Sequence, residues 1–213
     1  MKNLEILFED ENVIIINKPA GLAVQGGEGV KTSLDKILAE IRDPTPLLVH
    51  RLDKDTSGIL LAAKGREAAS LYSSLMGKNK KAVKQYTAVC SGCPKQETGV
   101  ITEKLNIRGN MKKSETKYKV IKKGKLPTPL LDEEYSVLEI ELCTGRMHQI
   151  RRHLAMKGNP VLADDKYGDF SLNKKLRKAG IKRLLLHASR LVIKEKINLD
   201  IHAPLPEYFN PFT

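Results

Sequence analysis

The chain has 213 residues, 41% hydrophobic and 29% charged, the composition of a globular protein that can bury its own core. Lysine and arginine number 37 against 25 acidic residues, and this formal net charge of +12 favours a polyanionic partner. Aromatic residues are only 5% and tryptophan is absent, which argues against the multi-base stacking surfaces of single-strand binders.

In chain order, the first half alternates short strands and helices. The apolar pattern predicts strands at residues 4–8, 12–17 and 58–63, and helices from Thr32 or Ser33 to before Pro44 and over residues 67–76. The second half is rich in β-branched residues. It predicts strands at 84–90, 100–105, 114–122 and 135–143, a helix from Gly145 through Lys157, and strands at 183–194 and 197–202.

These elements predict an α+β fold with a mixed, largely antiparallel central sheet and flanking helices. The sequence has no internal repeat and no clear linker, so we expect a single domain over residues 1–213. Residues 122–134 are rich in proline and charge and are the best candidate for a mobile insertion.

The N-terminus resembles no signal peptide, and no apolar run approaches the roughly 20 residues of a membrane-spanning helix. Three cysteines, an odd number, indicate reduced thiols, so we expect a cytoplasmic protein. Cys90 and Cys93 have redox or zinc spacing, but only Cys143 remains as a further thiol ligand, and His148 and His153 do not share one helix face. We therefore expect no metal site.

The first chemical motif is a charged loop that leads directly into an apolar strand: His50-Arg51-Leu52-Asp53-Lys54-Asp55-Thr56-Ser57-Gly58. A carboxylate on such a loop, beside Arg51, can be kept ionised and used as a nucleophile. A capped turn is the alternative reading of a lone aspartate before Thr-Ser-Gly.

The second motif opens the helix expected after residue 145: Thr144-Gly145-Arg146-Met147-His148-Gln149-Ile150-Arg151. Helical spacing places Met147, Ile150 and Leu154 on one apolar stripe that also contains Arg151. An arginine on a core-facing stripe needs a partner, and its geometry favours a bidentate carboxylate, for which Asp53 is the candidate. Pairing with another acid, or an outward-pointing side chain, remains the alternative.

These two motifs resemble the H-R-L-D-x-x-T-S-G and T-G-R-[ST]-H-Q-[IL]-R signatures of the RluA/RluD-like family of RNA pseudouridine synthases. A third, Lys84-Gln85-Tyr86-Thr87-Ala88, is similar to the family's K-x-Y-x-A strand. The resemblance runs from about residue 4 to residue 208, leaving no room for the N-terminal S4 domain that many relatives carry. Met147 departs from the usual Thr or Ser, and Ala163 stands where glycine is usual.

The resemblance implies an isomerase of ribosomal or transfer RNA that needs no cofactor, and we expect a monomer. It implies that Asp53 is the nucleophile, that Arg151 pairs with it, that Tyr86 packs on the target base, and that Arg51 fills the space the flipped base leaves. Further substrate contacts are expected from His50, Thr56, Lys80, Lys81, Arg146, His148 and Gln149. Lys78, Lys84, Arg152 and Lys157 are expected to extend a basic path for RNA.

Two other classes of function fit parts of the sequence. A glycosidase or nucleoside hydrolase could use Asp53 and Asp55, but it needs two carboxylates at a defined separation, and no second motif supplies one. A non-catalytic RNA-binding protein would use the basic surface alone, and it gives no reason for an arginine on the core side of a helix.

Overall fold

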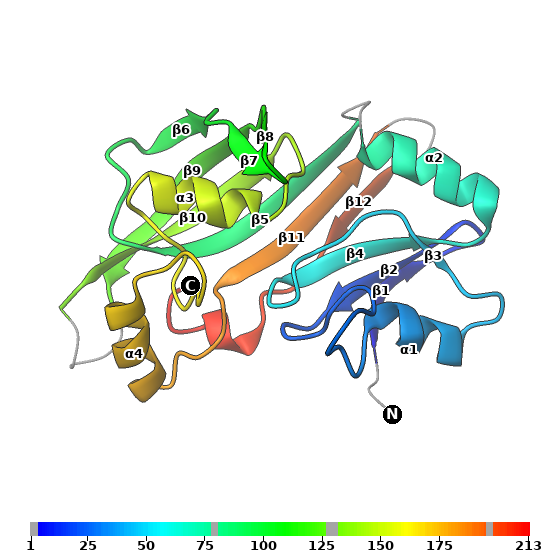
Figure 1. Ribbon diagram of the computed structural model, residues 1–213, viewed down its shortest axis with the longest axis horizontal. Helices are drawn as coiled ribbons and strands as arrows, with labels where there is room; N and C mark the ends of the chain where they lie inside the picture. Colours follow the sequence, from blue (N-terminus) through cyan, green and yellow to red (C-terminus); the bar gives the residue numbers. More distant parts are fainter. Residues whose placement is uncertain (1–3, 78–80, 127–131, 195–197) are drawn as a thin grey trace. The chain divides into compact units, whose positions relative to one another are not determined.

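The computed structural model describes residues 4–77, 81–126, 132–194 and 198–213, and the chain forms two compact units. The first unit comprises residues 1–83 and 188–204, and the second comprises residues 84–187 and 205–213. The elements of both units are labelled in Figure 1. The α+β class predicted from the sequence is confirmed, whereas the single domain over residues 1–213 stays a prediction.

The first unit is built on strands that are buried along their length. They run in the order β1-β2-β4-β11, with β3 beside β4 and β12 beside β11. Every residue of β4 is buried, as are residues 13–16 of β2, which is the pattern of strands covered on both faces. The bounds are β1 Glu5–Glu9, β2 Val13–Lys18, β3 Leu47–Leu48, β4 Ser57–Ala63, β11 Leu186–Ile193 and β12 Leu199–His202.

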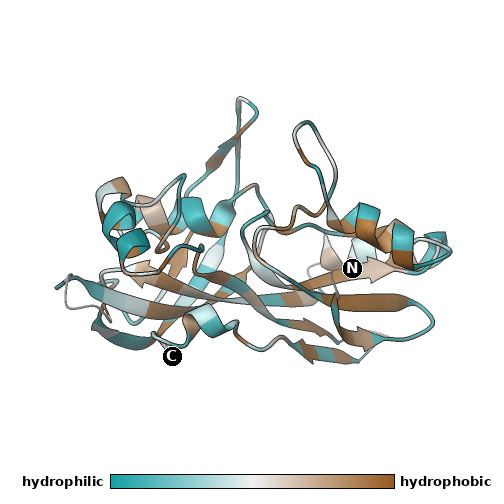
Figure 2. Cartoon of the chain, turned by 90° about the horizontal axis from the view of Figure 1, so that it is seen from below, coloured by the Kyte–Doolittle hydropathy of each residue, from teal (hydrophilic) through white to brown (hydrophobic). Residues whose placement is uncertain are grey.

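Two helices complete this unit, α1 Leu34–Ile41 and α2 Arg66–Met76. Tyr72 and Leu75 of α2 belong to the same buried cluster as Ile59 and Leu61 of β4. Figure 2 shows hydrophobic and hydrophilic residues alternating along the helices, as expected where one face of a helix is buried. Both helices are confirmed from their apolar spacing.

The second unit contains an antiparallel sheet in the order β5-β10-β9-β6 and a separate hairpin, β7-β8. Arg108 and Gly109 form the hairpin's two-residue turn, both at positive φ (51° and 83°), as a tight hairpin turn requires. The strands are β5 Ala82–Ser91, β6 Thr98–Ile101, β7 Leu105–Ile107, β8 Asn110–Lys112, β9 Thr116–Lys125 and β10 Glu134–Leu142. The helices are α3 Gln149–Met156, α4 Phe170–Lys178 and the 3-10 turn η1 Glu207–Phe209.

Several predicted boundaries are wrong, and one cause is backbone conformation. The helix expected from Gly145 begins only at Gln149, because His148 has a left-handed backbone (φ 51°) that cannot be part of an α-helix. Met147 therefore lies outside the helix and its apolar stripe, and it is 55% exposed. The strand expected at 100–105 is two strands, β6 and β7, and the strand expected from 183 starts at Leu186. The hairpin β7-β8 and α4 were not predicted.

Of the insertion expected at 122–134, residues 122–125 belong to β9, and residues 127–131 lie outside the described residues. Within the described part of the chain, none of the helices combines the length and the apolar character needed to cross a membrane.

Candidate functional site

In the first unit, the loop that carries Asp53 leads into β4 through a tight turn. The amide of Thr56 donates to the carbonyl of Asp53 (3.2 Å), and the side chain of Asp53 is half-buried. Gly58 follows at φ 107°, and a Cβ there would lie 2.2 Å from the carbonyl oxygen of Ala188. Only glycine satisfies both conditions, which explains why Gly58 ends the Thr-Ser-Gly sequence.

Lys18 anchors this loop from the end of β2, a role that was not anticipated from the sequence. Its side chain is fully buried, and Nζ donates to the carbonyls of Pro19 (3.0 Å), Leu22 (2.8 Å) and Lys54 (2.9 Å). The amide of Gly21 also donates to the Lys54 carbonyl (2.9 Å). The backbone next to Asp53 is therefore held by two donors.

Burial lowers the pKa of the Lys18 ammonium to about 8, although the charges of Asp55 and Asp53 act in the opposite direction. Three carbonyl acceptors satisfy all three N–H groups of an ammonium. A signal was present in the sequence: a lysine at the end of the apolar run Val13-Ile14-Ile15-Ile16-Asn17.

His50 holds the other end of the loop. The amide of Leu61 in β4 donates to Nε2 of His50 (2.9 Å), so this nitrogen must carry a lone pair and the imidazole is neutral in this arrangement. His50 is half-buried, Thr56 is 2% exposed and Arg51 is exposed. Of these three predicted substrate contacts, Arg51 is the one whose side chain is open to solvent, and all three roles stay predictions.

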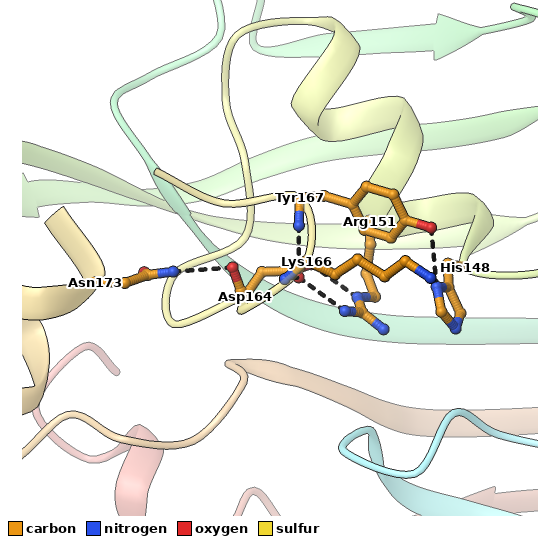
Figure 3. Close-up of polar contacts among 6 residues, drawn as sticks. All are labelled: His148, Arg151, Asp164, Lys166, Tyr167 and Asn173. Atoms are coloured by element: carbon orange, nitrogen blue, oxygen red, sulfur yellow. Dashed lines mark hydrogen bonds and ion pairs between the residues drawn. The ribbon is translucent and has the colours of Figure 1, made fainter. Parts of the chain in front are cut away.

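In the second unit, Arg151 lies on the buried side of α3, as its position on the apolar stripe predicted, with 6% of its surface exposed. Its bidentate partner is Asp164, which accepts from Nε and Nη2 of Arg151 at 2.7 Å each. The guanidinium also lies over the ring of Tyr167, 5.2 Å from the ring centre (Figure 3). The expected pairing of Arg151 with Asp53 stays a prediction.

The side-chain amide of Gln149 connects the segment before α3 to the start of β9. Its Oε1 accepts from the Thr144 hydroxyl (2.8 Å) and the Arg146 amide (3.1 Å). Its Nε2 donates to the carbonyl of Glu115 and to the hydroxyl of Thr116, both at 2.9 Å. These four hydrogen bonds use both acceptor sites and both donors of the buried side-chain amide, so Gln149 has a structural role. The substrate contact predicted for Gln149 stays a prediction.

His153 extends this network as a buried, neutral group. Its Nδ1 lies 2.9 Å from the Thr116 hydroxyl, and its Nε2 lies 3.0 Å from the carbonyl of Glu103. Burial is the main cause that lowers the pKa of His153. Among the described residues, no three His, Cys, Asp or Glu side chains form a group that could hold a metal ion.

The other predicted site residues of the second unit lie at varied depths. Tyr86 in β5 is 7% exposed and pairs across the sheet with Ile140 of β10. Arg146 is exposed and donates to the carbonyl of Lys113 (3.3 Å). His148 Nδ1 lies 3.0 Å from the hydroxyl of Tyr167 (Figure 3).

The expected basic path is described only in part. Lys78 and Lys80 lie outside the described residues, whereas Lys81 is exposed. Arg152 donates to the carbonyl of Asn106 (3.1 Å), and Lys157 pairs with Glu103 (2.5 Å). The RNA path itself stays a prediction.

Comparison with known proteins identifies relatives along most of the chain. Residues 12–156 match the family model described as RNA pseudouridylate synthase. Ribosomal large subunit pseudouridine synthase C of Rickettsia felis is 36% identical over 228 residues, covering 96% of this chain and 68% of that protein. The protein of the same name from Haemophilus ducreyi is 38% identical over 215 residues, covering 95% of this chain and 66% of the relative. The chain therefore spans about two thirds of the length of these relatives.

Solved structures agree with the sequence relatives. Human RNA Pseudouridylate Synthase Domain Containing 1 superimposes with a TM-score of 0.79 at 26% identity, covering 96% of this chain and 84% of that chain. Human RNA Pseudouridylate Synthase Domain Containing 4 gives the same TM-score at 25% identity, covering 97% and 90%.

Proposed function

Because the chain belongs to the RNA pseudouridylate synthase family, we propose that it converts uridines of ribosomal RNA to pseudouridine with Asp53 as the nucleophile. The observation that carries the proposal is the construction of the Asp53 loop. Lys18 and the Gly21 amide hold the backbone at Lys54, and His50 holds the start of the loop. A half-buried carboxylate on a rigid, positively charged support suits covalent catalysis.

Pseudouridylation breaks the bond between N1 of uracil and C1′ of the ribose, turns the base and joins C5 to C1′. The C5 proton is lost and N1 gains a proton, so the product is an isomer and no electrons are transferred. A carboxylate such as Asp53 can divide this change into steps by forming a transient covalent bond. The reaction therefore requires no redox cofactor.

The remaining roles follow from the side-chain chemistry. The target base must leave its stack, which costs a few kcal/mol, and an exposed arginine such as Arg51 can fill the vacated space. The Tyr86 ring packs on the base, and Arg151 supports the Asp53 carboxylate as a hydrogen-bond donor. The net charge of +12 supports binding to RNA phosphates, with an affinity that falls as salt rises.

The first testable prediction is that Asp53→Asn abolishes pseudouridine formation while RNA binding persists, because the amide keeps the shape of the carboxylate but is no nucleophile. Tritium release from RNA labelled at C5 of uridine measures turnover, and an electrophoretic shift measures binding. Asp55→Asn is the matched control in the same loop and should keep its activity, since Asp55 is an exposed neighbour.

Three results would contradict the proposal in different ways. Appreciable turnover by Asp53→Asn would remove Asp53 as nucleophile. Release of free uracil would indicate a hydrolase. Tritium release from transfer RNA but not from ribosomal RNA would support the proposed chemistry but show that the substrate is transfer RNA.

A further inference from the structure

The guanidinium of Arg151 is held from two directions inside the second unit (Figure 3). Asp164 binds its Nε and Nη2, and the Tyr167 ring lies against its face. The side chain of Asp164 is 0% exposed and that of Arg151 is 8% exposed, so solvent screens this pair little. The plane of the guanidinium is thus fixed by the protein.

The turn that carries Asp164 is itself rigidly built. One oxygen of its carboxylate accepts from the backbone amides of Lys166 (2.9 Å) and Tyr167 (3.0 Å), and its carbonyl accepts from Asn173 Nδ2 (2.8 Å). A Cβ on Gly168 would lie 2.5 Å from that carbonyl oxygen, so the chain can pass there only as glycine. These contacts fix the carboxylate before it meets Arg151.

The charge of Asp164 is also settled by its contacts. Burial alone would raise the pKa of this carboxyl, but hydrogen bonds from Arg151 and from the two amides lower the pKa below its ordinary value. Asp164 is therefore ionised and cancels the net charge of Arg151. In this arrangement Arg151 acts on other groups chiefly as a directed hydrogen-bond donor.

A guanidinium has five N–H donors, and Asp164 accounts for two of them on the Nε side. The direction of the other three follows from the plane that Asp164 and Tyr167 impose. Without these two contacts, a long arginine side chain would sample many rotamers.

We propose that Asp164 and Tyr167 are positioning residues for pseudouridylation, which act by orienting Arg151. The inference rests on the proposed function, in which Arg151 supports the Asp53 carboxylate. Neither positioning residue was singled out by the sequence motifs for catalysis. Tyr167 also lies 3.0 Å from His148 Nδ1, which links the arrangement to the residue before α3.

The test compares Asp164→Asn with Asp165→Asn. Asp165 is the adjacent carboxylate, but it is exposed and pairs with Arg177. We expect Asp164→Asn to lower kcat at saturating RNA by about 100-fold, the cost of a displacement on the order of 1 Å, with little change in KM. Asp165→Asn should leave both constants unchanged. Thermal melting of each variant verifies that it is folded.

A merely structural role would lower the folded fraction without acting through Arg151, and a double-variant cycle separates the two cases. If Asp164 acts through Arg151, then adding Asp164→Asn to Arg151→Gln lowers kcat by less than about twofold further. The proposal would be overturned if the kcat reductions of the two single variants multiplied in the double variant, or if folded Asp164→Asn kept an unchanged kcat.

If Asp164→Asn does not fold, Tyr167→Leu decides, because Tyr167 is only half-buried. Loss of the ring should lower kcat about threefold with KM unchanged, and an unchanged kcat overturns the proposal. Asp53→Asn is assayed alongside. Turnover by that variant counts against the proposed function, whereas full activity of Asp164→Asn beside an inactive Asp53→Asn counts only against the positioning role.

Discussion

Replacing Gly58 by alanine tests the argument that the Asp53 loop depends on a close backbone approach. Gly58 has φ 107°, and a Cβ there would lie 2.2 Å from the carbonyl oxygen and 2.7 Å from the amide nitrogen of Ala188. Both neighbours are backbone atoms, which cannot rotate away as a side chain could. Gly58→Ala must therefore displace a strand.

The magnitude follows by comparison with Gly65→Ala in the same unit. Gly65 also has a positive φ (88°), but a Cβ there meets nothing within 4 Å. Backbone strain alone costs about 1–3 kcal/mol, which both variants share. Overpacking adds about 1–3 kcal/mol or more in Gly58→Ala alone.

For a chain of this size, 1 kcal/mol lowers Tm by about 2–4 °C. We therefore expect Gly58→Ala to melt about 2–12 °C below Gly65→Ala, measured by circular dichroism under identical conditions. Equal melting temperatures would refute the steric argument and leave backbone strain as the sole cause.

The remaining predictions concern the two groups that hold the Asp53 loop. With its pKa lowered from 10.5 to about 8, Lys18 binds fewer protons in the folded than in the unfolded protein between these pH values. Its contribution to the free energy of unfolding therefore rises with pH across this window, by up to about 3 kcal/mol. Urea unfolding at pH 8 and pH 10 should show this rise in the native protein relative to Lys18→Met, and parallel curves would contradict it. His50→Leu leaves the Leu61 amide without this acceptor and should cost about 1–3 kcal/mol in urea unfolding, whereas His50→Gln retains an acceptor oxygen and should cost less; equal losses would mean that the bond is unimportant.

Patterns of apolar spacing predicted the elements with a clear buried face. The continuous apolar run at 58–63 corresponds to β4, and the inward position of Arg151 followed from helical spacing. Such periodicity reports burial, so it identified where a charged side chain is enclosed. It carries no information on which carboxylate reaches that side chain, and Asp164 was missed.

Features set by local backbone conformation escaped the same reasoning. Ala163 stands where family members usually have glycine, and its φ of 57° shows that the position is left-handed, a condition invisible in spacing. Helix α4 has few apolar residues and an exposed Phe170 (65%), so its periodic signal is weak. Its start was still readable, because Asp169 caps the helix by accepting from the amide of Leu172 (2.9 Å).

The burial of Lys18 has a consequence for the chemical reactivity of the chain. An amine buried completely and bonded to three carbonyls is inaccessible to acylating reagents as long as β2 and the Asp53 loop stay together. Exposed lysines react at once, whereas Lys18 can react only when the loop opens. The rate at which Lys18 is acylated, followed by mass spectrometry, therefore reports how often the loop that carries Asp53 opens.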